Sequence, residues 1–548
     1  MAFLRRPPAA SCRLRRRIAG QASAAVFSRC HRCRYTRTEF TCHPACTHGC
    51  IWNWRRGCLR IRARDCRQER IDTRSCEYCA DLGIRVPHAV TRIDPTLGNP
   101  VTPDLTYARP VVVDPDPLAW TTPPTDGISQ LMGQIKSADS SSLLSALGAA
   151  VLNRFANTQS DLQQSVASPG FRALVDGMDS AAVLQSAQSV QNNVGLTIHT
   201  ASGKEVDISI TFGGNQNVQD SLSVNVHASG KLSAAEQAAV AKLSTGFAAA
   251  LQGITSNPPQ VRVSGLVNID PSVLSSVDLK VQEPQSSSLK SLDLHADPGS
   301  RSFDMQGAAG SVSVSVDLSQ PALWGSAAQQ KTALLGYLDQ FDAANQRAHG
   351  GATLLGQFKD AFSQLNSSYT VSGQQPAQAL DASAPQALPV SALNSKNVSV
   401  LSGLADFKAS MSGEFDNGSA AHWTTEAGKI DYQVSQHTTT SGLAKSSGLS
   451  VAQTRAATLV ASYEQSRDGT MLDTTKGNYD EYRIDDSSST TTSLAYADSK
   501  LQSASIINQV NQLEVYQRFV NHKVVEQTST PHDTLTLQDI SAQLQPAL

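Results

Sequence analysis

The feature that most constrains this chain is the alternation of apolar and polar residues at every second position. In 311–318, valines and a leucine alternate with serines and an aspartate. Successive side chains of a strand point to opposite faces, so this pattern buries one face and hydrates the other. The same alternation occurs in 196–200, 206–212, 222–226, 292–294 and 303–305. The pattern predicts antiparallel sheets with one apolar face.

Between these runs the apolar period changes to three and four, which is typical of amphipathic helices. We interpret 128–192 as helical on this basis. Ser233 and Glu236 form a capping box that opens a helix reaching about Ile254. The segments 327–348 and 352–365 predict two helices joined at Gly350-Gly351, a helical hairpin. In this hairpin Leu334, Leu338 and Phe341 are expected to face Leu354, Phe358 and Phe362.

The C-terminal part, 398–537, is expected to be mostly strand, with turns near Asn417-Gly418, Asp468-Gly469 and Gly477-Asn478. The low-complexity stretch 485–492 is expected to be a loop, and a helix over 499–520 is an alternative for part of the region. The predicted fold class is therefore α+β. Antiparallel sheets interleave with helices and a helical hairpin, a β-rich C-terminal region follows, and a disordered extension precedes them.

Composition divides the chain into five segments. Residues 1–92 are an Arg/Cys-rich extension, and 93–127 are a linker with eight prolines. An α+β domain over 128–370 and a linker over 371–396 follow. The last segment, 397–548, is the β-rich C-terminal domain.

Three interpretations compete for residues 1–92, which hold 20 Arg, no Lys and six acidic residues, a net charge of +14. The favoured one is a disordered extension, or a leader that results from a wrongly assigned start codon, because Arg without Lys is typical of out-of-frame translation of GC-rich DNA. The second is a targeting segment. The third is an arm that binds metal or nucleic acid through the pairs Cys30/Cys33 and Cys76/Cys79.

The remaining 456 residues exclude several classes of protein. They contain no Cys, which excludes a disulfide framework and a Cys-built metal site. No run of 18 apolar residues occurs, so no membrane-spanning helix is expected. Their net charge of -16 disfavours nucleic acid as a partner, since binding to phosphates needs a positive surface.

Two short motifs match known spacings without their companions. Tyr496 and Lys500 have the YxxxK spacing of short-chain dehydrogenases, but no glycine-rich nucleotide-binding turn accompanies them. Ser287 and Lys290 have the SxxK spacing of penicillin-recognising enzymes, without the SDN or KTG partners. We interpret both as chance matches, and the chain has no Walker A, HExxH, GxSxG or EF-hand motif.

Two clusters of ionisable residues could carry chemistry. His199, His227 and His295 are expected on the solvent face of one sheet, where grouped imidazoles could bind Zn²⁺ or Cu²⁺. Carboxylates at Asp480, Glu481, Asp485 and Asp486, beside Tyr479, Tyr482 and Arg483, could work on a glycan or hold Ca²⁺. In both cases we interpret the residues as ordinary surface groups, and we assign no catalytic, cofactor or metal residue.

The favoured hypothesis is a non-enzymatic structural or binding protein, exported or surface-associated in a bacterium; a cytoplasmic location is the alternative. Low charge and abundant Ser are typical of such proteins. Its partner would be another protein, paired through an exposed strand edge such as Ser311–Leu318. The alternatives are an enzyme of unknown class, perhaps a hydrolase with carboxylates in 468–486, and metal or nucleic-acid binding through residues 1–92.

Overall fold

The structure is a computed structural model. It describes residues 118–544, except 159, 189–191, 216, 284–287, 368–398, 419–423, 442–447, 468 and 498–499. It also describes the backbone of four short strands before residue 60. Met1–Tyr107 and Ala108–Leu548 form two separate units. In the first, β1 (Cys30–Thr36) pairs with β2 (Glu39–Cys46), and β3 (Trp54–Arg55) with β4 (Cys58–Leu59). The predictions for the side chains of 1–92, and for most of both linkers, lie outside the described residues.

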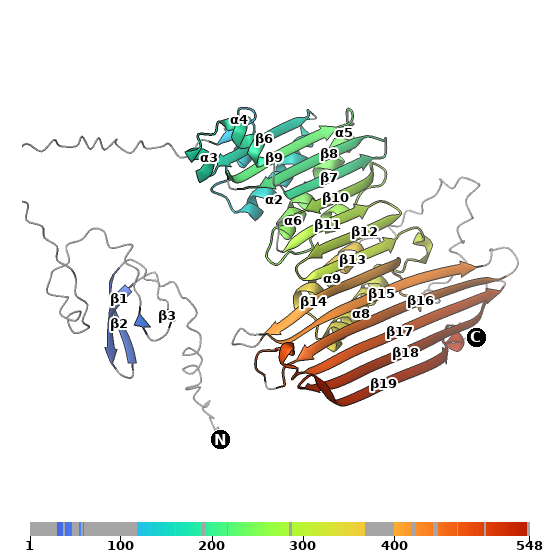
Figure 1. Ribbon diagram of the computed structural model, residues 1–548. Coiled ribbons are helices and arrows are strands. Elements are labelled where there is room, and N and C mark those ends of the chain that lie inside the picture. The colour runs from blue at the N-terminus through green and yellow to red at the C-terminus, as the bar shows by residue number, and fades with distance from the viewer. Residues whose placement is uncertain are drawn as a thin grey trace, which may run out of the picture. The chain divides into compact units, whose positions relative to one another are not determined.

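One antiparallel sheet organises the second unit (Figure 1). Within the described ranges it has 15 strands, in the order β19-β18-β17-β16-β15-β14-β13-β12-β11-β10-β7-β8-β9-β6-β5. These strands are β5 (Ala119–Trp120), β6 (Leu162–Pro169), β7 (Asn192–Thr200), β8 (Glu205–Gly213), β9 (Val218–Ala228), β10 (Leu274–Gln282), β11 (Leu289–Ala296), β12 (Ser300–Gly307), β13 (Gly310–Asp317), β14 (Asp406–Gly418), β15 (Thr424–Ser441), β16 (Leu449–Gln465), β17 (Asp480–Ala497), β18 (Lys500–Val520) and β19 (Lys523–Asp539). Because β13 pairs with β14, the sheet continues from 128–370 into the C-terminal segment.

Most of the helices cover one face of this sheet, which we call the helix-covered face; on the other, the open face, α3 (Phe171–Val175) and α4 (Ser180–Ala187) pack over Ala119 and Ala167. Figure 1 looks onto the open face, with the other helices on the far side of the strands. The described α-helices of this unit are α1 (Gly127–Met132), α2 (Ser140–Asn153), α3 (Phe171–Val175), α4 (Ser180–Ala187), α5 (Ala234–Lys242), α6 (Ser244–Ile254), α7 (Ser264–Val267), α8 (Ala327–Arg347), α9 (Ala352–Leu365) and α11 (Ser541–Leu544). The expected α+β class, with a strand-rich C-terminal region, is confirmed.

The alternation of the strands explains where the core lies. In β7, Val194, Leu196 and Ile198 are fully buried against the helices, while the residues between them are only half-buried on the open face. Ser233 caps α5 in a capping box with Glu236, as predicted. The hydroxyl of Ser202 and the amine of Lys204 also bind Glu236, and these hydrogen bonds hold its pKa far below the usual range.

The predicted helical hairpin is confirmed, and its aromatic residues form the core beneath the long strands. The ring centroid of Phe341 in α8 lies 4.7 Å from that of Phe358 and 5.0 Å from that of Phe362 in α9. Phe341 also contacts Tyr432 of β15 edge to face, at 5.8 Å. The hairpin therefore joins β15 to the core.

Three local predictions are wrong. Residues 162–169 belong to the stretch expected to be helical but form β6, which lies between β5 and β9. The expected loop 485–492 belongs to β17, and the alternative helix 499–520 is β18. Ser and Thr carry little periodic signal, and β-branched Thr fits a pleated strand well. Neighbouring strands on both sides then decide the structure.

Candidate functional site

Strand β19 is the free edge of the sheet. In the described part of the chain it pairs only with β18, and all of its residues are exposed. At the opposite edge Thr121 and Thr122 donate hydrogen bonds to Oε1 of Gln164 and so cover part of β6. The expectation that Ser311–Leu318 is an exposed edge is wrong, because β13 pairs with β12 on one side and β14 on the other.

The direction of the backbone groups of β19 follows from one hydrogen bond in β18. The N–H of Leu513 donates to Oδ1 of Asp486 in β17, 3.2 Å away, so it points away from β19. Leu513 is paired with Pro531 in β19. Because the backbone groups of Leu513 point away from β19, the two residues form a non-hydrogen-bonded pair, in which the backbone of Pro531 points away from β18, toward solvent. Because backbone direction alternates along a strand, the backbones of Gln527, Ser529, Asp533, Leu535, Leu537 and Asp539 also point outward.

Pro531 interrupts this outward row near the middle of β19. Proline has no N–H, so it fits a sheet only where that group would face solvent, as it does here. The row of outward donors is therefore divided into a part before Pro531 and a longer part after it. An exposed strand without such a break would offer a continuous template for another chain.

Replacing Pro531 by Thr is expected to make the protein self-associate, because the substitution restores an outward N–H and joins the two parts of the row. Sedimentation velocity at increasing protein concentration would measure this. A matched control, Pro531→Thr combined with Leu535→Pro, moves the break and should stay monomeric. A P531T variant as monomeric as the parent protein would show that Pro531 does not protect the edge.

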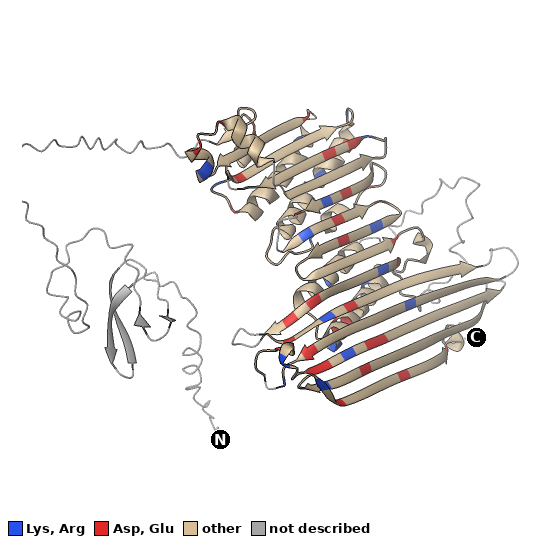
Figure 2. Ribbon diagram, in the orientation of Figure 1, with Lys and Arg blue, Asp and Glu red and all other residues tan. Residues whose placement is uncertain are grey.

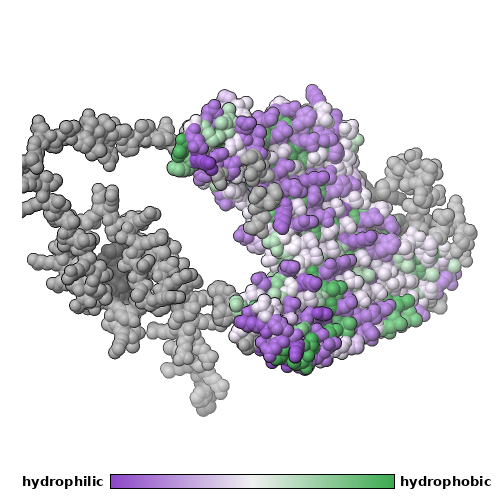
Figure 3. Space-filling view, in the orientation of Figure 1, coloured by the Kyte–Doolittle hydropathy of each residue, from purple (hydrophilic) through white to green (hydrophobic). Residues whose placement is uncertain are grey.

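Apolar side chains gather at both ends of β19. Leu535 and Leu537 are 72% and 74% exposed, and Ile507 of β18 lies opposite Leu537. Near the other end, Val524 and Val525 are also exposed. Figure 3, which views the open face, shows two hydrophobic areas along the β19 border, one near each end of the strand. Isolated exposed leucines are common, but contiguous ones next to unpaired backbone groups indicate an interaction site.

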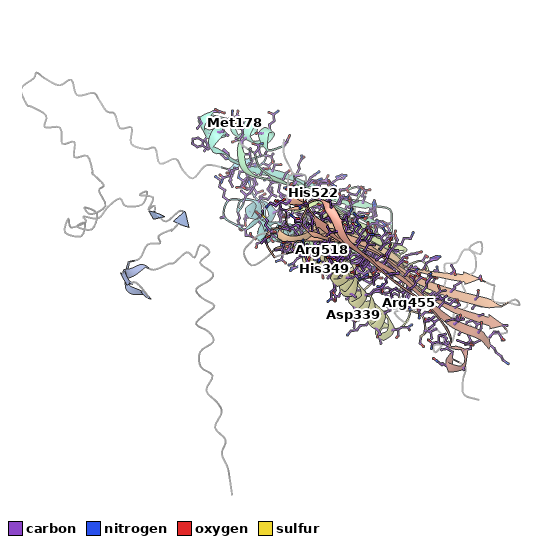
Figure 4. All side chains as sticks on the ribbon, turned by 60° about the horizontal axis from the view of Figure 1, so that its bottom comes forward. Met178, Asp339, His349, Arg455, Arg518 and His522 are labelled. Atoms are coloured by element: carbon purple, nitrogen blue, oxygen red, sulfur yellow. The ribbon has the colours of Figure 1, made fainter. Side chains whose placement is uncertain are left out.

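A row of stacked rings holds the strands next to this edge in register. On the helix-covered face, the ring of His349 stacks on Tyr463 at 4.3 Å, and Tyr463 on Tyr482 at 4.6 Å. Tyr516 follows at 5.1 Å, and Arg518 lies over its ring. We call these five residues the tyrosine row; Figure 4 labels His349 and Arg518 at its two ends. Such cross-strand pairs stabilise a sheet where few helices cover it.

The phenols of the tyrosine row are poor candidates for catalytic bases. Burial raises the pKa of Tyr463, and the neighbouring Tyr482 and Glu514 raise it further. Burial also raises the pKa values of Tyr482 and Tyr516. The three hydroxyls stay protonated at neutral pH. A base would need the opposite shift.

The carboxylates singled out in 480–486 do not converge, because alternate residues of β17 face opposite sides of the sheet. On the helix-covered face, Arg518 donates to Asp480 at 3.0 Å and Arg347 to Asp486 at 2.7 Å. On the open face Glu481 accepts from Arg483 at 2.8 Å. A single acid–base site made of these four carboxylates is therefore excluded.

Glu481 lines a shallow groove of about 1010 Å³ on the open face. Glu464, directly opposite it on β16, also lines the groove. Burial and the charge of Glu481 raise the pKa of Glu464. Figure 2 shows most of the charged residues of β14–β18 at this end of the strands.

The three histidines share the open face, as predicted, but they do not meet. Asp278, Thr197 and Asp207 separate His295 from His227 across the sheet, a path of about 19 Å at the spacing of neighbouring strands. His295 lies 2.7 Å from Asp278 and 2.9 Å from Asp297, and His227 lies 3.0 Å from Asp161. Among the described residues no group of three or more His, Cys, Asp or Glu could hold a metal ion.

The contacts of His295 predict a pH dependence of stability. Burial disfavours the charged imidazole, but the hydrogen bonds to Asp278 and Asp297 outweigh it and raise the pKa of His295. The stabilisation of the folded protein by His295 is therefore complete below the pKa of a histidine in the unfolded chain, about 6.5. It disappears as the pH rises through the pKa of His295 in the folded protein.

We expect His295→Gln to reduce the loss of stability between pH 5.5 and pH 8.5, measured as the shift of the urea midpoint. Asp278→Asn, which removes one of the two charges facing the imidazole, should act in the same direction. Equal shifts in the parent protein and in H295Q would contradict this assignment.

The two short motifs have no site around them. Tyr496 is buried in an apolar cluster with Leu449 and Leu494, whereas Lys500 is exposed at the start of β18. Ser287 lies outside the described residues, and Lys290 is exposed on β11. The sequence signal for the free edge was Pro531 within an alternating run, since proline in a strand indicates an edge.

Comparisons with known proteins give no relative. No protein-family description, curated protein or solved structure matches this chain. Among the helices in the described ranges, none has the length and apolar character needed to cross a membrane.

Proposed function

We propose that this chain is a non-enzymatic structural or binding protein that engages another protein by adding a strand to β19. The observation that carries the proposal is the free edge itself. It is a 17-residue strand that is exposed along its whole length, with a set of backbone groups directed outward. In strand addition these groups bind the main chain of a partner, and side chains beside them select it.

The surroundings of β19 support this role. The tyrosine row and the ion pairs of Arg347 and Arg518 fix β16–β18, so the edge is already formed before a partner arrives. A partner that joins a preformed edge does not have to order it, which lowers the entropic cost of binding.

We further propose that the protein is exported or surface-associated in a bacterium. The support is compositional: after residue 92 the chain has no Cys, and only 66 of 456 residues are charged. Subcellular fractionation of the native host would test this, and a wholly cytosolic pool would contradict it.

Photo-crosslinking in the native host tests the proposed role of the edge. A photoreactive residue at Thr536, which is exposed near the middle of the longer outward part, should give one discrete adduct, and Leu535→Pro should abolish it. That variant removes an outward N–H, which β18 does not use, so folding should be unaffected; circular dichroism would verify this. A photoreactive residue at Phe171, 83% exposed on α3, is the matched control. No adduct at Thr536, or one that persists in L535P, would overturn the proposal.

A second candidate function, hydrolysis in the open-face groove, is favoured by one observation. The raised pKa of Glu464 favours its protonated form, which acid-assisted hydrolysis needs as a proton donor, and Glu481 lies directly opposite it on β17. Glu464→Gln should abolish such an activity in a glycoside-substrate screen. Absence of turnover by the parent protein in the same screen would count against this candidate.

A further inference from the structure

The side chains on the longer outward part of β19 point to a specific class of partner. Resting on the proposed strand addition, we propose that residues 533–539 bind an extended segment in which two apolar residues at alternate positions are flanked by basic residues. The segment would read basic, any, apolar, any, apolar, any, basic. This pattern is the same in both chain directions, so it holds for parallel and antiparallel pairing.

The position of the site follows from the backbone. After Pro531, the outward N–H groups of Asp533, Leu535, Leu537 and Asp539 follow one another without a break. Before it, only Gln527 and Ser529 offer such groups ahead of the irregularity near Arg518. A partner strand therefore obtains its longest ladder over 533–539, a span of about 20 Å.

Apolar contact comes from the side chains of the same residues. Side chains of residues with outward backbones all point to the open face, so Leu535 and Leu537 lie next to Ile507 there. Two apolar side chains of an added strand would stand opposite the two leucines. Burial of these leucines, which are 72% and 74% exposed, would contribute to affinity.

Charge comes from the two aspartates that flank the leucines. No ion pair among the described residues involves Asp533 or Asp539; Arg518 lies opposite Glu526, toward the other end of β19, and binds Asp480 and Glu526. The hydroxyl and backbone N–H of Ser541 bind Asp539 and lower its pKa, which keeps it charged. Opposite charges directly across a strand pair stabilise it, so lysine or arginine fits both positions.

A second copy of this chain fits the same edge poorly. Antiparallel pairing of two 533–539 segments places Asp533 of each copy opposite Asp539 of the other, and like charges across a strand pair are destabilising. Longer registers bring Pro531, which lacks a donor, into the ladder.

Fluorescence anisotropy with blocked peptides tests the proposal on the full chain. The probe is Lys-Thr-Val-Thr-Val-Thr-Lys, and the matched control replaces both lysines by glutamates. We expect the basic peptide to bind at least tenfold more tightly at low salt. Asp533→Asn with Asp539→Asn should remove most of this preference, and Leu535→Pro should abolish binding of both peptides. N-methylation of the peptide backbone on alternate residues should also abolish binding.

The outcomes separate the partner class from the edge itself. Equal binding of the two peptides, lost in L535P, would overturn the basic partner but leave strand addition intact. Binding that L535P leaves unchanged, or no binding of either peptide, would overturn this proposal. Concentration-dependent dimers of the parent protein that L535P abolishes would replace the basic segment with a second copy as the occupant.

Discussion

Replacing Phe341 by Ala is expected to lower the free energy of unfolding by about 3–5 kcal/mol, the usual cost of removing a buried aromatic ring. Phe341 is fully buried, and its ring contacts Phe358 and Phe362 of α9 and Tyr432 of β15. The cavity would lie where the helical hairpin joins the sheet. Urea unfolding followed by circular dichroism would measure the change.

The matched control for F341A is Leu335→Ala on the same helix. Leu335 is 50% exposed, so its truncation should change stability by only about 0.5 kcal/mol. Similar losses in the two variants would contradict the packing of the hairpin against β15.

Replacing Arg347 by Met is expected to cost about 2–3 kcal/mol, because it leaves two carboxylates without their cation. Arg347 ends α8 and lies 2.7 Å from both Asp486 of β17 and Glu514 of β18. Asp486 is mostly buried, so water replaces the lost partner poorly. The urea midpoint should fall accordingly.

Two further variants separate the loss of charge pairing from the loss of packing. In a background with Asp486→Asn and Glu514→Gln, R347M should cost much less, because no carboxylate is left unpaired. Lys359→Met removes an ion pair to Asp342, which is half-exposed, and should cost at most about 1 kcal/mol. An R347M variant as stable as K359M would show that Arg347 does not hold the long strands to α8.

The sequence alone determined the local elements of the fold. Alternation in 311–318 identified β13, and the capping box at Ser233 identified the start of α5. Spacing of three and four placed Phe341 opposite Phe358. These features are readable because each depends on side chains within one or two turns or one strand.

Only the tertiary structure decided which strands pair and which strand is the edge. The pairing of β10 with β7 joins residues about 80 positions apart in the chain, and no local pattern encodes it. Ser311–Leu318 has the cleanest alternation yet lies inside the sheet, whereas the edge is the less regular β19. The carboxylates of 480–486 were close in sequence, but a period of two sent them to opposite faces. Local periodicity sets which side chains share a face, while the long-range backbone hydrogen bonds set which strands remain unpaired.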